Sequence, residues 1–371
     1  MLRNPGAAVR RAAIPLVVSC CLISGLVAQT LPPQLATSKQ IREMLVQYVD
    51  GEHKADAVIV GLISKRGREI ISYGKFAPDD ARVPDGESIF EIGSVTKVFT
   101  ALLLSDMVLR GEVKLNDPIA KYLPASVHVP TRSGKQITLL DLATHHSGLP
   151  RMPTGVTWDY SLDQMYDFLS HYTLTRDPGA AYEYSNYGAA LLGQILAQRA
   201  GTDYPTLLHT RITGPLQMNH TAVQPTPEMQ AKLVPSYHDG LPARPIDINA
   251  FEAAGAIRSN VDDMLVFLAA NMGLIRTPLR PAMKNMLKVR REASPGVEIA
   301  LGWHIMNGGN LVWHNGGTAG YHAFVGFEPR RKLGIVVLSN SAQFTDDMAQ
   351  HILNYPVSAP AEIEVGPPNL H

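Results

Sequence analysis

Cysteine is almost absent from this chain of 371 residues, and both cysteines, Cys20 and Cys21, fall within its first thirty residues. If that segment is removed as a secretory signal, the mature chain contains no thiol. Disulfide bonds, cysteine nucleophiles and cysteine-based metal sites are then excluded. An exported chain without disulfides depends on its hydrophobic core, and roughly 340 residues are enough to build one.

An excess of charge of either sign is also missing, because 33 basic residues balance 33 acidic residues. This balance gives no reason to expect a nucleic-acid partner or strong electrostatic attraction to a membrane. Hydrophobic residues make up 45% of the chain and charged residues 18%, which is typical of a globular protein with a large core. The composition leaves the oligomeric state open.

Segment 1–28 has the pattern of a signal peptide. Three arginines within the first eleven residues precede the apolar run AAIPLVVSCCLISGLVA, which ends at Ala28. This pattern predicts cleavage after Ala28 and a mature domain over 29–371. The run is short for a membrane span and contains Pro15, so cleavage is favoured over an anchor. We expect export to the periplasm or the medium, with no transmembrane span left. A lipoprotein formed at Cys20 is less favoured, since LISGLVA would follow the lipidated residue.

Strand patterns occur at both ends of the mature chain. Residues 57–77 read as two β-rich runs around the turn KRGRE, which predicts a hairpin. Between Ile299 and Ser341 follow LGWHIM, LVWHN, YHAFVGF and LGIVVLS, whose short links suit antiparallel pairing. Helical signals dominate in between. We therefore expect an α+β fold with one antiparallel sheet, formed by about 55–92 and 299–355 and flanked by helices, and an inserted, mostly helical part over about 94–290.

Local signals also predict several helix ends. Thr138 with Asp141 and Ser161 with Gln164 are typical of capping boxes. The apolar-striped run NYGAALLGQILAQRAG predicts a helix that ends at Gly201, and SNVDDMLVFLAANMG predicts one that starts near Ser259. A last helix is expected over 345–354, followed by a loose tail.

The stretch EIGSVTKVFT, residues 91–100, places a serine three residues before a lysine. The helix VTKVFTALLLSDMVLRG that follows is apolar on nearly every side, and such a helix is usually buried. Ser94 at its start meets unpaired backbone N–H groups and the positive end of the helix dipole. Burial and the dipole favour the neutral amine of Lys97, the form that a general base requires. A serine cap beside a lysine that reaches solvent is the alternative, and this helix alone leaves both open.

Two further motifs contain polar residues in loops. YEYSNYG at 182–188 has Tyr184 and Asn186 two residues apart just before a helix, where a loop can direct both side chains into one cleft. The alternative is a packed tyrosine and an asparagine cap. WHNGGTAGY at 313–321 is a strand end that becomes a glycine-rich turn. Its glycines predict close approach of a ligand to the backbone, unless the turn is a plain hairpin.

Taken together, SVTK, YSN and HNG resemble, in this order, the serine β-lactamase and penicillin-binding-protein superfamily, for which S-x-x-K, S-D-N and K-T-G is a sister set. The Tyr-x-Asn second motif is similar to that of the class C branch, as are ITLLDLATHHSGLPR (137–151) and GEVKLNDPIAKYLP (111–124). That branch includes periplasmic DD-carboxypeptidase/endopeptidases and esterases. The resemblance covers about 57–342 and implies a β-lactamase/transpeptidase-like fold without a cofactor. The absence of a GxSxG motif argues against an α/β-hydrolase.

The resemblance implies catalytic roles for three side chains. Ser94 would attack a carbonyl and form an acyl-enzyme, and Lys97 and Tyr184 would move its proton to the leaving group. The backbone N–H groups of Ser94 and Gly317 would form an oxyanion hole, commonly worth about 3 kcal/mol per donor. The implied substrate-binding residues are Asn186 for the amide of the acyl side chain, Asn340 for a carboxylate, and His314 and Gly317 in the third motif.

The third motif departs from the β-lactamase pattern, because His314 stands where those enzymes usually carry lysine. Lysine is a permanent cation for a substrate carboxylate, whereas histidine is mostly neutral at pH 7. Family members with histidine at this position include esterases and peptidases. We therefore expect an exported serine hydrolase of small-molecule or peptide substrates, most of all D-alanyl peptides, peptidoglycan fragments or β-lactams. The alternatives are a carboxylesterase of the same fold and a non-catalytic penicillin-binding relative.

No metal site is expected from the thirteen histidines. His145 and His146 are adjacent, and neighbouring side chains rarely converge on one ion. No HExxH motif occurs. Packing or loop hydrogen bonding is the interpretation that we favour for this pair.

Overall fold

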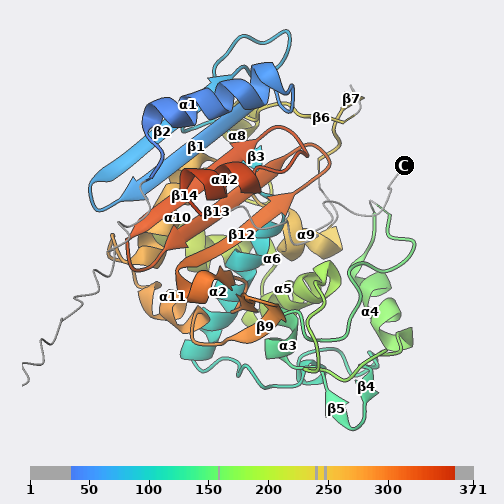
Figure 1. The fold of residues 1–371 in the computed structure, drawn as a ribbon. Helices are drawn as coiled ribbons and strands as arrows, with labels where there is room; N and C mark the ends of the chain where they lie inside the picture. The colour runs from blue at the N-terminus through green and yellow to red at the C-terminus, as the bar shows by residue number, and fades with distance from the viewer. Residues whose placement is uncertain (1–34, 158, 239–240, 246–248, 356–371) are drawn as a thin grey trace, which may run out of the picture.

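One antiparallel sheet of eight strands, in the order β2-β1-β14-β13-β12-β11-β10-β9, organises the chain (Figure 1). The computed structural model describes residues 35–355 except 158, 239–240 and 246–248, so the predicted signal peptide lies outside the described residues. Strands from both chain ends are neighbours, because β1 pairs with β14. The strands are β1 Ala57–Ser64, β2 Gly67–Gly74, β9 Arg291–Ser294, β10 Val297–Ile299, β11 His304–Met306, β12 Leu311–Gly317, β13 His322–Glu328 and β14 Leu333–Ser339.

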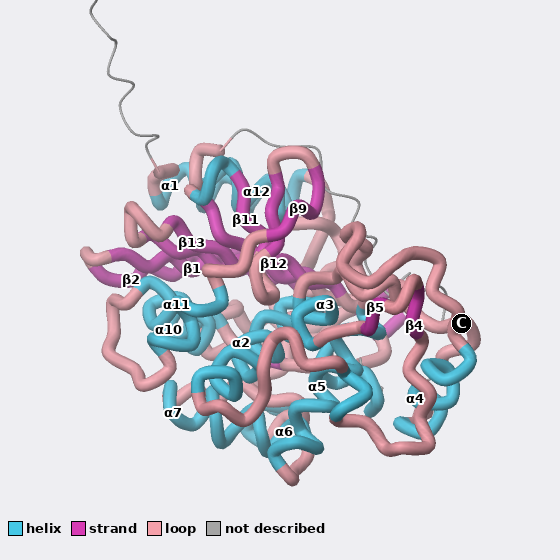
Figure 2. Tube along the Cα trace, turned by 90° about the horizontal axis from the view of Figure 1, so that it is seen from below, coloured by secondary structure: helices cyan, strands magenta, loops and turns pink. Residues whose placement is uncertain are grey.

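Helices cover both faces of this sheet. In Figure 2, α1 (Ser38–Val46) and α12 (Asp346–Ile352) lie above it, and α2 (Thr96–Leu109), α10 (Val261–Met272) and α11 (Arg280–Met286) lie beneath it. The central strands are buried along their whole length, so alternate side chains enter two separate cores. Ala323 and Val325 of β13 join the core under the sheet, whereas Phe324 packs against the α1 side.

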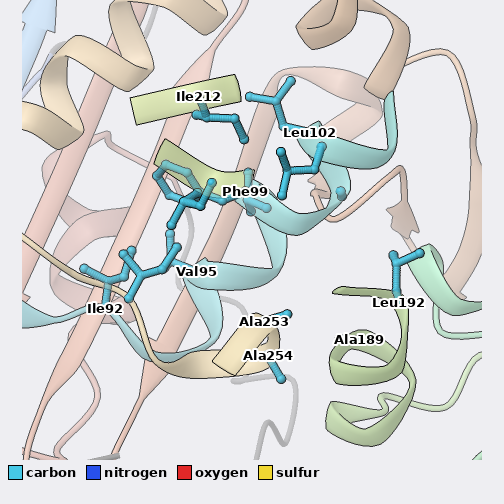
Figure 3. Packing of buried hydrophobic residues seen from close by; sticks show 14 of the residues in the cluster. Ile92, Val95, Phe99, Leu102, Ala189, Leu192, Ile212, Ala253 and Ala254 are labelled. Carbon is cyan, nitrogen blue, oxygen red and sulfur yellow. The ribbon is translucent and has the colours of Figure 1, made fainter. Parts of the chain in front are cut away.

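Helix α2 lies in the middle of the larger core, as its apolar sequence predicts. Figure 3 shows Val95, Phe99 and Leu102 in this packing, with Ala253 and Ala254 nearby. The ring of Phe99 stacks on Phe267 of α10 with centroids 4.4 Å apart. Since this helix is enclosed by neighbouring elements, the turn in front of it is held in place from several sides.

The inserted part of the chain is mostly helical and packs below the sheet (Figure 2). Its short strand pairs are β3 (Phe90–Glu91) with β8 (Arg258–Ser259), β4 (Thr131–Arg132) with β5 (Lys135–Gln136), and β6 (Tyr237–His238) with β7 (Leu241–Pro242). Besides α2, α10 and α11, its α-helices are α3 Leu139–Ala143, α4 Leu162–His171, α5 Asn186–Ala200, α6 Tyr204–Leu208, α7 Gly214–Leu216, α8 Pro227–Ala231 and α9 Glu252–Gly255. Single turns of other helix types span Gln47–Gly51, Gly93–Val95, Ile119–Lys121, His209–Thr213, Asn249–Phe251 and Asn307–Gly309.

Many predicted helix ends are confirmed, but two strand boundaries are not. Strand β11 begins only at His304, and β12 extends to Gly317, two residues beyond the predicted LVWHN, because Gly316 and Gly317 still pair with β13. Thr138 and Ser161 form capping boxes, and Gly201 ends α5 in the left-handed conformation with φ 70°. Helix α10 begins at Val261 because the side chain of Asn260, not Ser259, accepts the hydrogen bond from Asp263 N. Strands β9 and β10 were not predicted, since their sequence has little apolar alternation and they are held by pairing, β9 with β10 and β10 with β11.

Candidate active site

A single turn of 3₁₀ helix over Gly93–Val95 places Ser94 at the entrance to α2. Gly93 adopts a φ of 49°, a conformation that costs glycine little. The serine side chain is half-buried, whereas the residues that flank it are buried. The predicted position of Ser94 at the start of a buried helix is therefore confirmed.

Lys97 lies one turn further along and points back to Ser94. Its Nζ lies 2.9 Å from Ser94 Oγ and donates a hydrogen bond of 2.7 Å to the carbonyl of Ala254 in α9. The side chain is only 3% exposed, so it does not reach solvent. Burial, helped by the charge of Arg151, holds the pKa of Lys97 well below its usual value. The geometry favours an uncharged amine that can accept the proton of Ser94.

Tyr184 lies against this pair. Its ring centroid is 4.9 Å from Lys97 Nζ, and its hydroxyl oxygen is buried without a well-formed hydrogen bond to a described residue. Burial raises the pKa of Tyr184 to about 12, although the nearby Ser94 hydroxyl and the charge of Arg151 oppose this rise. The phenol therefore keeps its proton at neutral pH. Burial thus lowers the pKa of Lys97 and raises the pKa of Tyr184. At neutral pH the amine is suited to accept a proton and the phenol to donate one.

Asn186 is the first residue of α5, but it does not cap that helix. The cap is Ser185, whose Oγ accepts a 2.8 Å hydrogen bond from Gly188 N. The backbone N–H of Asn186 donates to the carbonyl of Arg151 at 3.0 Å. Its half-buried side-chain amide has no hydrogen bond to a described residue. The alternative of an asparagine cap is thus wrong, and the amide remains available to a ligand.

His314 faces the core under the sheet from β12, on the same side of the strand as Val312. Its Nδ1 lies 2.5 Å from the carbonyl of Asn315, and its Nε2 is buried without a hydrogen bond to a described residue. Burial and the charges of His304 and Lys97 lower the pKa of His314 well below its usual value. The imidazole at this position is therefore neutral. His314 does not supply the positive charge that a lysine would supply here, as the sequence predicted.

Gly316 and Gly317 bring β12 into direct contact with the turn that carries Ser94. A Cβ added at Gly316 would lie 2.1 Å from Ile92 O and 2.6 Å from Ser94 N. A Cβ added at Gly93 would lie 2.8 Å from Gly317 N. From the sequence, the glycine at 316 was expected to allow close approach of a ligand to the backbone. In the structure, the group that approaches Gly316 is the backbone of the Ser94 turn, so the prediction is incomplete. This contact places the backbone N–H groups of Ser94 and Gly317 on adjoining segments.

Replacing Gly316 with alanine should destabilise the protein by about 3 kcal/mol, as overpacking in a core does. It should also lower the acylation rate steeply, because the turn around Ser94 has to move. Urea unfolding and the rate of labelling by a penicillin probe measure the two effects.

Gly188→Ala is the matched control, since its added Cβ would meet only side-chain atoms, Ser185 Oγ at 3.2 Å and Ser185 Cβ and Leu142 Cδ2 at 3.5 Å. This control should lose far less stability than the Gly316 variant, because side-chain atoms can move aside more easily than the backbone around Ser94. Wild-type stability and labelling of the Gly316 variant would contradict the packing argument.

Asn340 directly follows β14, which lies on the opposite side of β13 from β12. Its Oδ1 accepts hydrogen bonds from Ala57 N at 2.8 Å and Asp56 N at 3.2 Å, and its Nδ2 donates to Pro235 O at 2.8 Å. These contacts tie the end of β14 to the start of β1 and engage both ends of the Asn340 amide. The expected contact of Asn340 with a substrate carboxylate stays a prediction.

Two side chains that the sequence analysis did not assign to the site also contact Tyr184. The ring of His145 lies 4.5 Å from the Tyr184 ring, and the guanidinium carbon of Arg151 lies 5.3 Å from it. His145 Nδ1 accepts a hydrogen bond from Ser185 N at 3.1 Å, which confirms loop hydrogen bonding for this histidine. His146 likewise bonds within its loop, with Nδ1 2.6 Å from Thr144 O.

Among the residues that the structure describes, no group of three or more histidine, cysteine or acidic side chains is placed to hold a metal ion. None of the helices that the structure describes combines the length and the apolar character needed to cross a membrane.

The fold and the serine–lysine pair define a serine hydrolase of the class that includes β-lactamases and DD-peptidases. A sequence model of the β-lactamase family matches residues 44–355, and the chain belongs to that family. It is 28% identical over 314 residues to the D-alanyl-D-alanine-carboxypeptidase/endopeptidase AmpH of Escherichia coli, covering 78% of this chain and 81% of that protein. It is also 27% identical over 292 residues to the β-lactamase of the same organism, covering 68% of this chain and 76% of that enzyme.

A solved structure of similar shape supports the fold. The β-lactamase/D-alanine carboxypeptidase of Pseudomonas syringae superposes with a TM-score of 0.78, covering 87% of this chain and all of that chain, at 22% identity. At this level of identity the likeness concerns the fold alone. The predicted α+β class, with its sheet built from both chain ends, is confirmed.

Proposed function

We propose that this protein is an exported serine hydrolase that opens amide or ester bonds through an acyl-enzyme on Ser94, with D-alanyl peptides, peptidoglycan fragments or β-lactams as substrates. The observation that carries the proposal is the 2.9 Å separation of Lys97 Nζ and Ser94 Oγ inside a buried site. The family relationship supports the reaction class. The arginine-containing start and the apolar run of 1–28 support export.

In the first half-reaction, Ser94 Oγ attacks the carbonyl carbon while its proton passes to Lys97 Nζ. Negative charge develops on the carbonyl oxygen, where the N–H groups of Ser94 and Gly317 stabilise it. The protonated amine and the Tyr184 phenol deliver a proton to the leaving group as its bond to carbon breaks. Asn186 holds the amide of the acyl part during these steps.

In the second half-reaction, a water molecule attacks the acyl-enzyme. The water loses a proton to the Lys97–Tyr184 pair, and Ser94 Oγ leaves with a proton from the same pair. The roles of the first half-reaction are thereby reversed, and the free serine is restored.

A carboxylesterase is the second candidate function, and a specific feature of the site favours it. The pKa of His314 is held low by burial, so the third motif supplies no cation for a carboxylate on the leaving group. An ester with an uncharged leaving alcohol needs no such cation. The two candidates therefore differ in the leaving group that the site accepts.

Turnover by the purified protein separates these candidates. A D-Ala-D-Ala peptide, nitrocefin and a short-chain nitrophenyl ester should be compared by kcat/KM at neutral pH. Higher kcat/KM for the peptide or for nitrocefin supports the main proposal, and turnover of the ester alone supports the second candidate. If none of the three substrates is turned over or forms an acyl-enzyme, the protein is not a hydrolase of this kind.

A further inference from the structure

Arg151 brings a permanent charge to the edge of the active site. It lies in the loop between α3 and α4 and is half-buried. The carbonyl of Arg151 accepts hydrogen bonds from Asn186 N at 3.0 Å and Tyr187 N at 3.2 Å, which fix its backbone to the start of α5. Its guanidinium carbon lies 5.3 Å from the centroid of Tyr184. The arginine is therefore positioned by the same helix start that carries the second motif.

The guanidinium of Arg151 has no ion pair or side-chain hydrogen bond with a described residue, although other arginines of this region do. Arg291 pairs with Asp141 at 2.8 Å, and the buried Arg258 pairs with Glu91 at 3.0 Å. A planar guanidinium with five N–H donors matches a carboxylate in both charge and geometry. The half-buried guanidinium of Arg151, which has no anionic partner among the described residues, can therefore bind a carboxylate of a ligand.

The other basic side chains against Tyr184 are poor candidates for this task. Burial holds the pKa values of Lys97, His145 and His314 well below their usual ranges. Lys97 Nζ is further committed to Ser94 and to the carbonyl of Ala254. Among the described side chains that touch the Tyr184 ring, Arg151 is thus the one whose positive charge persists at neutral pH.

We propose that Arg151 is a specificity-determining residue that binds a carboxylate of the substrate, so that the enzyme prefers acyl compounds carrying a free carboxylate. This inference rests on the proposed function, because it concerns the substrate of the same site. The carboxylate can belong to the leaving group, as at the C-terminus of a peptide, or to the acyl part. In either case it forms a charge-assisted pair with the guanidinium.

Binding to a protein that cannot turn over its ligand tests the pairing independently of catalysis. In a Ser94→Ala background, calorimetry should compare a D-Ala-D-Ala peptide with its C-terminal amide, and glutaric acid mono-anilide with its uncharged pentanoic acid anilide analogue. At least one acid should bind about tenfold or more tightly than its uncharged partner. The pair that shows the preference identifies the side of the scissile bond on which the carboxylate lies.

Adding Arg151→Gln should remove this preference, whereas Arg151→Lys should retain part of it. Arg66→Gln is the control for loss of a charge, since Arg66 is exposed in the turn between β1 and β2 and should leave the preference intact. Higher salt should weaken the preference in proteins that keep Arg151.

Two results would overturn the inference. One is equal affinity for acid and uncharged partner in both pairs. The other is a loss of affinity on Arg151→Gln that is the same for both members of each pair, which would mean that Arg151 acts on Tyr184 and Lys97 instead of the ligand. If the wild type turned over no substrate at all, the proposed function would fail while these binding measurements still decided the role of Arg151.

Discussion

Replacing Ser94 with alanine should abolish covalent labelling by a penicillin-type probe and lower kcat by about 10⁴-fold or more, because the acyl-enzyme can no longer form. The hydroxyl that is lost contacts Lys97 Nζ at 2.9 Å and faces Tyr184, and it caps neither the 3₁₀ turn nor α2. The variant should therefore fold and bind ligand. Intact-protein mass spectrometry after incubation with the probe measures the adduct, and urea unfolding verifies the fold.

The control for Ser94→Ala is the same substitution at Ser294, an exposed serine of β9. The Ser294 variant should label like the wild type, and proteolysis of the labelled wild type should place the adduct in the peptide that contains Ser94. Equal labelling of the Ser94 variant and the wild type would remove Ser94 from the mechanism. It would also return the SVTK motif to the interpretation of an ordinary helix start.

Local sequence signals were sufficient for most of the framework. The run LGIVVLS predicted both ends of β14 correctly, because a β-branched run between two turns identifies a strand without any knowledge of its distant partners. Gly201 ended α5 because a left-handed residue is needed there and glycine supplies it cheaply. Strands β9 and β10 were missed because they are short, half-exposed and held by backbone pairing, β9 to β10 and β10 to β11, contacts that a local pattern does not carry.

Only those residues of the site that belong to the three motifs could be predicted from the sequence. Ser94, Tyr184 and His314 come from three separate parts of the chain, and their order was enough to suggest that they meet. Their surroundings were not visible, because Ala254 O, His145 and Arg151 reach them only through tertiary packing. Gly316 illustrates the same limit. Its sequence context indicated a close approach, but only the fold identifies the Ile92–Val95 backbone as the partner.

Replacing Lys97 with methionine, which has a similar length and no charge, should lower the acylation rate by about 10³-fold or more, since the base for Ser94 is lost. In the wild type, the rate should rise with pH while Lys97 loses its proton and then level off well below pH 10.5, because burial and Arg151 depress the pKa of this amine. Below that pKa the fraction of neutral amine falls tenfold per pH unit. Stopped-flow acylation from pH 4 to 10 measures the profile, which the methionine variant should lack.

The same pKa shift predicts an effect on stability with a definite sign. Between the lowered pKa of folded Lys97 and the usual value of 10.5, the unfolded chain binds one more proton than the folded chain. The contribution of Lys97 to the free energy of unfolding therefore increases with pH, by up to about 1.4 kcal/mol per pH unit. Lys97→Met removes this contribution, so the stability of the variant relative to the wild type should decrease between pH 7 and pH 10. Urea unfolding at pH 7, 8 and 9 measures this difference, and parallel pH dependences for both proteins would show that the buried amine is charged in the native state.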